Sequence, residues 1–172
     1  MTSALLIIDF QNAVFTEPAA YQADLVLERI SGLIARARQA GMPVVYVQHD
    51  EASTIWEKGR NTWHFPAVIA PQPDDFVSAK QHSSAFQGGN FQTELAARGI
   101  DELYVCGYAS EFCLDSTIRQ AAALGFKTVV IEDAHTTRHR PHLDAPTITQ
   151  HHNWVWREMG QIRVIPAAQL PF

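Results

Sequence analysis

Short apolar runs rich in β-branched residues alternate with longer amphipathic stretches along this chain. Such alternation is typical of βαβ units, in which helices cover the faces of a parallel sheet. The apolar runs predict six strands, at residues 4–8, 43–48, 76–79, 102–106, 127–131 and 162–165. The pattern therefore predicts an α/β fold built around a parallel sheet.

The stretches between these runs predict helices. Apolar side chains recur at helical spacing after the first strand, at Leu27, Ile30, Ile34 and Ala37. Gly41 then ends this helix, and further helices are predicted at residues 91–98, 112–124 and 146–159. Residues 50–75 are rich in Trp, Pro and charge without any period, which predicts a long loop with a short helix at most. Long loops in compact domains are often functional.

Composition narrows the class of protein. A length of 172 residues with 47% hydrophobic side chains suits one domain, residues 1–172, with a full core. The net charge of −5 and the scattered lysines and arginines argue against a nucleic-acid partner. The first apolar run stops at Asp9, too short for a signal peptide or a membrane span, and two cysteines form no disulfide framework. We therefore expect a cytoplasmic protein with no membrane association.

Polar side chains stand at the ends of three predicted strands. Asp9 closes the first strand, Lys80 closes the third, and Cys113 follows the fourth where a predicted helix begins. Because the carboxyl ends of parallel strands meet at one edge, we expect these side chains to converge in one crevice. The helix N-terminus and Lys80 would favour the thiolate of Cys113, while Asp9 would carry its proton to a leaving group.

Each of these residues also has a structural interpretation. A free cysteine is usually a small buried hydrophobe, and Cys106, inside an apolar run, is expected to be one. Taken alone, Asp9 suits a helix cap and Lys80 a solvated strand end. The joint placement of a carboxylate, an ammonium and a thiol favours catalysis.

Longer stretches around these residues resemble a known family. Asp9 with Gln11, Lys80 followed by residues 84–86 (SAF), and residues 107–113 (GYASEFC) are together similar to the isochorismatase-like cysteine hydrolases. That family includes nicotinamidases and N-carbamoylsarcosine amidohydrolases, and the similarity spans nearly the whole chain. It implies a three-layer α/β/α fold with a six-stranded, parallel, Rossmann-like doubly wound sheet.

The resemblance also implies the site. The catalytic triad of the family would be Asp9, Lys80 and Cys113 here. A cis peptide would join Tyr108 to Ala109, and the backbone N–H groups of Ala109 and Cys113 would form an oxyanion hole. The expected reaction is attack by the Cys113 thiolate on an amide-type carbonyl, loss of ammonia or an amine, and hydrolysis of the thioester with Asp9 as base.

Three alternatives stay open on the sequence. One is isochorismatase-type hydrolysis of a vinyl ether, although members with that chemistry generally do without the cysteine. A second is a redox thiol protein, which the absence of a Cys-x-x-Cys motif disfavours. The third is a binding or scaffold protein with the same fold and no catalysis.

Metal binding is not expected. Nicotinamidase-type relatives hold a divalent ion through an Asp-x-His pattern and a further His, whereas here residues 48–51 (QHDE) and His64 do not reproduce that order. His49 and Asp50 are interpreted as residues that shape the site or hold a loop. His135 is expected in a solvated loop. The resemblance implies no other cofactor.

The expected partner is a small-molecule substrate. Its candidate contacts are one amide and six aromatic side chains, Gln11, Phe15, Trp56, Trp63, Phe86, Tyr108 and Phe112. Any one aromatic residue is more often part of a core, and Trp56 and Trp63 are favoured because they lie in the irregular segment. Relatives commonly form homo-oligomers, so a dimer or tetramer is expected.

Overall fold

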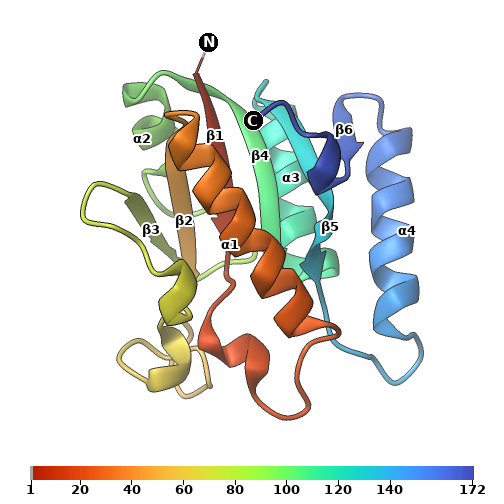
Figure 1. Ribbon diagram of the computed structural model, residues 1–172. Coiled ribbons are helices and arrows are strands. Elements are labelled where there is room, and N and C mark those ends of the chain that lie inside the picture. Colours follow the sequence, from red (N-terminus) through yellow and green to blue (C-terminus); the bar gives the residue numbers. More distant parts are fainter. Residues whose placement is uncertain (1) are drawn as a thin grey trace.

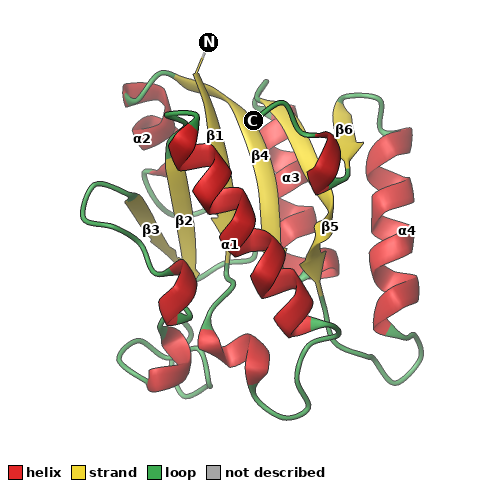
Figure 2. Cartoon of the chain, in the orientation of Figure 1, coloured by secondary structure: helices red, strands yellow, loops and turns green. Residues whose placement is uncertain are grey.

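Six parallel strands form one sheet in the computed structural model, which describes residues 2–172 (Figure 1; Figure 2). The strands are β1 (Thr2–Ile8), β2 (Val44–His49), β3 (Phe76–Lys80), β4 (Ile100–Tyr108), β5 (Lys127–Thr136) and β6 (Ile162–Ile165). Their spatial order is β3-β2-β1-β4-β5-β6, so the strand order reverses between β1 and β4. In a doubly wound sheet, the crevice at such a reversal is where ligands bind.

Helices cover both faces of the sheet. They are α1 (Ala23–Gln39), α2 (Phe91–Ala97), α3 (Asp115–Ala123) and α4 (Ala145–Glu158). The buried side chains of α1 pack in one core, and those of α2, α3 and α4 pack in another; in Figure 1, α1 crosses in front of the strands while α3 lies behind them. This arrangement confirms the predicted three-layer α/β/α fold with six parallel strands.

The central strand shows why the two cores form. Leu5 and Ile7 of β1 face the core of α1, whereas Leu6 and Ile8 face the opposite core, and all four are fully buried. A strand covered on both faces carries a continuous apolar run instead of an alternating pattern. The run at the start of the chain is therefore explained by burial. Within residues 2–172, no helix is long and apolar enough to cross a lipid bilayer.

Local structure departs from the sequence prediction in three places. The predicted helix at residues 112–124 is a π-helical turn, η4 (Ser110–Leu114), that leads into α3. The irregular segment contains two short 3₁₀ turns, η2 (Asn61–Trp63) and η3 (Ala67–Ile69). Strand β5 continues to Thr136, so the prediction of a solvated loop for His135 is wrong, because this side chain is buried at the end of a strand.

Gly107 of β4 is required by the close approach of β4 to β1. Its φ is +126°, and a Cβ built on it would lie 2.1 Å from the carbonyl oxygen of Ile8. Gly107 is the register partner of Ile8, the last residue of β1. The missing side chain therefore lets the carboxyl ends of β1 and β4 come together. Asp9 follows the end of β1, and Ala109 follows the end of β4.

We expect Gly107→Ala to lower the free energy of unfolding by about 3 kcal/mol or more, because its methyl group would overlap backbone atoms that have no room to move. Gly125→Ala is the matched control, since Gly125 has a φ of +88° but nothing within 4 Å of its added Cβ. That control should cost about 1 kcal/mol, the effect of the backbone conformation alone. Urea unfolding followed by circular dichroism measures both, and equal losses would contradict this explanation of Gly107.

Candidate active site

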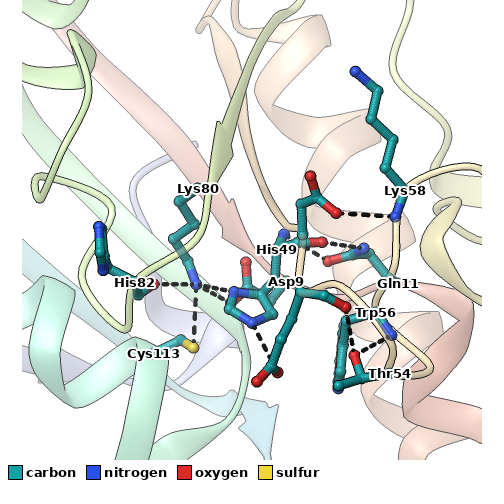
Figure 3. Close-up of polar contacts among 11 residues, drawn as sticks. Asp9, Gln11, His49, Thr54, Trp56, Lys58, Lys80, His82 and Cys113 are labelled. Carbon is teal, nitrogen blue, oxygen red and sulfur yellow. Dashed lines mark hydrogen bonds and ion pairs between the residues drawn. The ribbon is translucent and has the colours of Figure 1, made fainter.

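The structure brings Asp9, Lys80 and Cys113 together at the carboxyl edge of the sheet (Figure 3). Asp9 follows β1, Lys80 ends β3, and Cys113 lies in the π-helical turn η4 after β4. Lys80 Nζ is 2.6 Å from Asp9 Oδ2 and 3.2 Å from Cys113 Sγ. Since β2 separates β3 from β1 in the sheet, the long lysine side chain is what reaches across to Asp9.

Asp9 and Lys80 form a buried ion pair. Their side chains are only 2% and 1% exposed, respectively. Burial by itself would lower the pKa of Lys80, but the Asp9 carboxylate and Cys113 raise it above its ordinary value. Lys80 therefore stays an ammonium. Apart from this ion pair, neither carboxylate oxygen of Asp9 has a hydrogen-bond partner within residues 2–172, which leaves Asp9 free to accept a proton.

The backbone of Asp9 has a conformation that aspartate adopts more readily than most residues. Its φ is +49°, in the left-handed region. Its N–H donates to the Val47 carbonyl at 2.9 Å, and its own carbonyl accepts from the Gln11 N–H at 2.9 Å. These bonds fix the turn that follows β1 and so fix the carboxylate beside Lys80.

Cys113 rests as a thiol. Burial raises its pKa to about 12, the Asp9 carboxylate adds to this shift, and the Lys80 ammonium opposes it. Lys80 favours the thiolate, in the direction that the sequence predicts, but burial and the Asp9 carboxylate outweigh it and the pKa of Cys113 is raised. The sulfur gains its charge only when a base removes the proton, and Asp9 is the neighbouring base.

A cavity of about 370 Å³ opens over the sulfur. One part of its wall is aromatic or small and is made by Trp56, Tyr108, Ala109 and Phe112. The remainder is mostly polar and is made by Asp9, His49, Glu51, Gln81, His82, Ser83, Cys113 and Arg140. A space of this size suits a small molecule that carries both a flat apolar part and polar groups.

Three of the predicted substrate contacts line this cavity: Trp56, Tyr108 and Phe112. The rings of Trp56 and Tyr108 stack with their centroids 5.7 Å apart and their planes 23° from parallel. Trp56 comes from the irregular segment, whereas Tyr108 ends β4 and Phe112 lies in η4 beside the sulfur. The segment without periodicity therefore contributes one wall of the cavity.

Gln11 and Trp63 are placed in a different role. The buried Gln11 amide donates to the carbonyls of His49 and Trp63 at 3.1 and 2.7 Å, and its oxygen accepts from the His49 N–H at 2.8 Å. Gln11 therefore ties the end of β2 to the irregular segment. The Trp63 ring packs edge-on against His64 and lies outside the cavity wall.

Phe15 and Phe86 also lie outside the cavity wall. Phe15 packs edge-to-face on Phe10, with ring centroids 5.9 Å apart, beside the core of α1. Phe86 packs on Phe91 and Phe126 at 5.0 and 5.6 Å, beside the opposite core. Both rings therefore serve packing, the role that aromatic residues most often have.

Asp9, His49 and Cys113 form a set of donor atoms that lie within 4.8 Å of one another, a spacing compatible with one metal ion. The ammonium of Lys80 already lies 2.6 Å from the Asp9 carboxylate, 3.1 Å from His49 Nδ1 and 3.2 Å from the sulfur. Lys80 thus places a positive charge where a cation would bind. Asp50 accepts from the Lys58 N–H at 2.9 Å, which holds the loop after β2.

The turn that carries the sulfur begins at a cis peptide between Tyr108 and Ala109, as the resemblance implies. The Ala109 carbonyl accepts from the N–H groups of Phe112 and Leu114, each at 3.1 Å. Ala109 and Cys113 both line the cavity. Their backbone groups therefore border the space above the sulfur.

Sequence analysis missed a buried network behind this turn. Ser110 Oγ lies 2.8 Å from His135 Nδ1, and His135 Nε2 lies 3.0 Å from Asn153 Oδ1. Burial lowers the pKa of His135 to about 4, so the ring is neutral at neutral pH. Because Asn153 Oδ1 can only accept, the ring carries its proton on Nε2 and accepts from the Ser110 hydroxyl on Nδ1. His135 thereby fixes the turn from behind.

Sequence analysis also missed Arg140, as it missed Gln81, His82 and Ser83 of the cavity wall. The Arg140 guanidinium lies 2.7 Å from Glu111 Oε1 and 5.0 Å from the centroid of the Phe112 ring. Arg140 follows β5 and lines the same cavity as Glu51, which follows β2. The predicted strand ends at residue 131, whereas β5 continues to Thr136, so no strand-end signal marks Arg140 in the sequence.

Comparisons with known proteins place the whole chain in context. Residues 3–164 match the family model described as the isochorismatase domain. A streptothricin hydrolase from Streptomyces noursei is 34% identical over an alignment that covers 98% of this chain and 64% of that protein, so the chain spans less than two thirds of its length. A ureidoacrylate amidohydrolase from Variovorax paradoxus is 31% identical over 77% of this chain and 68% of that protein.

Solved structures agree with the fold. A crystal structure described as an isochorismatase family protein has a TM-score of 0.89 and 32% identity, and covers 95% of this chain and 97% of that one. The N-carbamoylsarcosine amidase from Thermoplasma acidophilum has a TM-score of 0.83 at 24% identity, with both chains fully covered. At that identity the second likeness shows the fold alone.

We expect the network of His135 to make folding stability depend on pH. The pKa of this ring is about 4 in the folded protein and about 6.5 when exposed, so the unfolded chain binds the extra proton between these values. Stability from the neutral ring is complete above pH 6.5 and is lost as the pH falls toward 4, by about 3 kcal/mol at most.

Urea unfolding at pH 7, 6, 5 and 4.5 tests this expectation. The difference in the free energy of unfolding between the parent and His135→Gln should shrink as the pH falls, because glutamine does not titrate. His151→Gln, at an exposed position of α4, is the control and should follow the parent at every pH. A parent-to-His135→Gln difference that is constant over this range would contradict the assignment.

Proposed function

Because the chain belongs to the isochorismatase family of hydrolases, we propose that it cleaves an amide-type C–N bond of a small molecule through a thioester on Cys113. The observation that carries this proposal is the convergence of Asp9, Lys80 and Cys113 below a cavity. Relatives named streptothricin hydrolase and ureidoacrylate amidohydrolase support the amide chemistry.

The first step is formation of the nucleophile. Asp9 takes the thiol proton from Cys113 while Sγ attacks the carbonyl carbon of the substrate, so a buried thiolate need not persist on its own. The Lys80 ammonium, 3.2 Å from Sγ, stabilises the negative charge as it develops. A thiol with a raised pKa is therefore suited to react only when an electrophile is in place.

The second requirement is a site for the oxyanion of the tetrahedral intermediate. The backbone N–H groups of Ala109 and Cys113, which border the cavity, are the proposed donors. Removal of a single donor of this kind costs about 3–4 kcal/mol of transition-state stabilisation in other enzymes. The Ser110–His135 hydrogen bond of 2.8 Å would hold these groups in position.

Three proton transfers that involve Asp9 close the cycle. The intermediate collapses with cleavage of the C–N bond, and protonated Asp9 gives its proton to the departing nitrogen, which leaves as ammonia or an amine. Water then attacks the thioester while Asp9 accepts its proton. Release of the carboxylic acid product returns that proton to the sulfur and restores the thiol of Cys113.

The walls of the cavity favour a small planar substrate with polar ends. The stacked rings of Trp56 and Tyr108 offer a flat apolar surface, while Glu51 and Arg140 add an acidic and a basic group to the cavity wall. Hydrogen-bond donors near Glu51 and acceptors near Arg140 would orient a ureide or a short amide. The volume of about 370 Å³ suits a molecule of that size.

The test is release of ammonia or amine from a panel of small amides, ureides and nicotinamide by the parent and by Cys113→Ala. We expect turnover to fall by at least about 1,000-fold in the variant, because the covalent route is lost. Cys106→Ala is the matched control: Cys106 is buried in β4, outside the cavity wall, and its thiol donates to the backbone carbonyl of Leu6, at 3.6 Å. This control should keep its activity.

The outcomes separate the proposal from its rivals. Unchanged turnover by Cys113→Ala would exclude the thioester route. Hydrolysis of a vinyl ether without hydrolysis of any amide would assign isochorismatase-type chemistry instead. Binding of panel members without any turnover by the folded parent would assign a binding protein.

A further inference from the structure

Lys80 has more acceptors around it than it has protons to donate. Its Nζ lies 2.6 Å from Asp9 Oδ2, 3.0 Å from the His82 carbonyl, 3.1 Å from His49 Nδ1 and 3.2 Å from Cys113 Sγ. An ammonium carries three N–H groups. Figure 3 shows the dashed contacts to the histidines and to the sulfur diverging from the one nitrogen. One of the four acceptors is therefore always left without a donor.

Two of these acceptors can keep their contact with Lys80 throughout the cycle. Asp9 Oδ2, in the buried ion pair, remains an acceptor when the other carboxylate oxygen holds the thiol proton, and the His82 acceptor is a backbone carbonyl that does not titrate. The other two acceptors differ. Cys113 Sγ is a weak acceptor as a thiol and a strong one as a thiolate, so its demand changes within a catalytic cycle. His49 Nδ1 is then the acceptor with which the sulfur competes.

His49 is held so that Nδ1 faces Lys80. It ends β2 as the register partner of Lys80 in β3, so the sheet itself sets the two side chains next to each other. Its backbone is clamped by the Gln11 amide through bonds of 2.8 and 3.1 Å, and its ring packs edge-on against Trp56. Because Nδ1 accepts from an ammonium, the ring proton is on Nε2, which lies 3.5 Å from Glu51 Oε2.

We propose that His49 and Cys113 share one N–H of Lys80, and that His49 is the positioning residue that holds this N–H while the sulfur is neutral and yields it when the thiolate forms. The inference deepens the proposed function and rests on it for its catalytic meaning. No bond other than a hydrogen bond changes in this step. The thiol proton itself passes from Sγ to the Asp9 carboxylate, as in the mechanism above.

The exchange follows the charge on the sulfur. In the resting thiol, the third N–H of Lys80 donates to His49. As the proton leaves Sγ, this N–H donates to the thiolate instead. In the thioester, it donates to His49 again. Burial and the Asp9 carboxylate, which raise the pKa of Cys113, agree with a neutral sulfur in the resting site. While the sulfur is neutral, His49 thus accepts an N–H that would otherwise be buried without a strong acceptor. A buried N–H without an acceptor costs free energy.

Other ionisable and charged groups face this pair from each neighbouring element. They are Asp9 after β1, Glu51 after β2, Lys80 and His82 at the end of β3, Tyr108 at the end of β4 and Arg140 after β5. Each of them is present in the parent and in every variant below. Differences between those proteins therefore report the change at position 49.

The experiment is the rate of alkylation of Cys113 by iodoacetamide between pH 6 and 9 in the parent and in His49→Leu. Leucine removes the competing acceptor, which destabilises the thiol form but not the thiolate form. The pKa of Cys113 should therefore fall by about one to two units. Because a less basic thiolate is also a weaker nucleophile, the alkylation rate at a fixed pH should rise only about three- to tenfold.

Matched variants separate a shared N–H from a general disturbance. His49→Asn places a carbonyl oxygen near the position of Nδ1 and should restore the rate of the parent. His49→Phe keeps the ring without an acceptor, should behave as His49→Leu, and replaces it if the leucine variant does not fold. His64→Ala, at an exposed position outside the cavity wall, should match the parent. Mass spectrometry of the labelled peptide assigns the reaction to Cys113 and not to Cys106.

The inference is overturned if both His49→Leu and His49→Phe alkylate no faster than the parent at any pH. It is equally overturned if His49→Asn accelerates alkylation as much as His49→Leu does, because the acceptor would then be irrelevant. The proposed function fails in a different assay. If Cys113→Ala keeps its amide turnover while His49→Leu still shows the faster alkylation, the N–H is shared but the sulfur is not the nucleophile.

Discussion

The buried ion pair between Lys80 and Asp9 is the interaction on which the rest of the site depends. Two opposite charges, each almost without exposed surface, lie 2.6 Å apart at the carboxyl edge of the sheet. A buried charge whose partner is removed lowers the free energy of unfolding by about 3–5 kcal/mol, so replacement of either residue alone destabilises the fold. In the proposed mechanism this pair also sets the chemistry, since the ammonium would stabilise charge on Cys113 while the carboxylate keeps an unbonded lone pair for its proton. The cation needed beside the sulfur is thus a fixed part of the fold.

Sheet topology explains how this pair can be assembled. The order β3-β2-β1-β4 puts one strand between Lys80 and Asp9, and the intervening strand ends in His49, which contacts the same ammonium. On the other side, Gly107 lets β4 approach β1 so closely that the turn carrying Cys113 begins beside Asp9. The cavity therefore lies at the reversal of strand order, and charged groups form its floor. Helices α1 on one face and α2, α3 and α4 on the other supply the cores that hold the strands in register.

The elements that the sequence predicts well are those with a simple periodic or positional signal. The six strands follow from apolar runs, and the grouping of Asp9, Lys80 and Cys113 follows from their place at strand ends, because parallel strands share one carboxyl edge. Side-chain environment has no such signal. Trp56 and Trp63 look alike in the sequence, since both lie in the irregular segment, yet only Trp56 reaches the cavity, because long-range packing decides which ring is covered. The resting thiol of Cys113 and the buried His135 were missed for the same reason, since both depend on how much water is excluded by distant segments.

The central claim is that catalysis proceeds through a covalent acyl group on one sulfur. Its most direct test is acid quenching of the parent during turnover of an amide substrate, followed by mass spectrometry of the intact protein and of its peptides. The account predicts a mass increase equal to the acyl part of the substrate, located on the peptide that contains Cys113, which disappears when the substrate is exhausted. Product formation at the same rate with no acyl adduct on Cys113 at any quench time, under conditions that preserve thioesters, would contradict it.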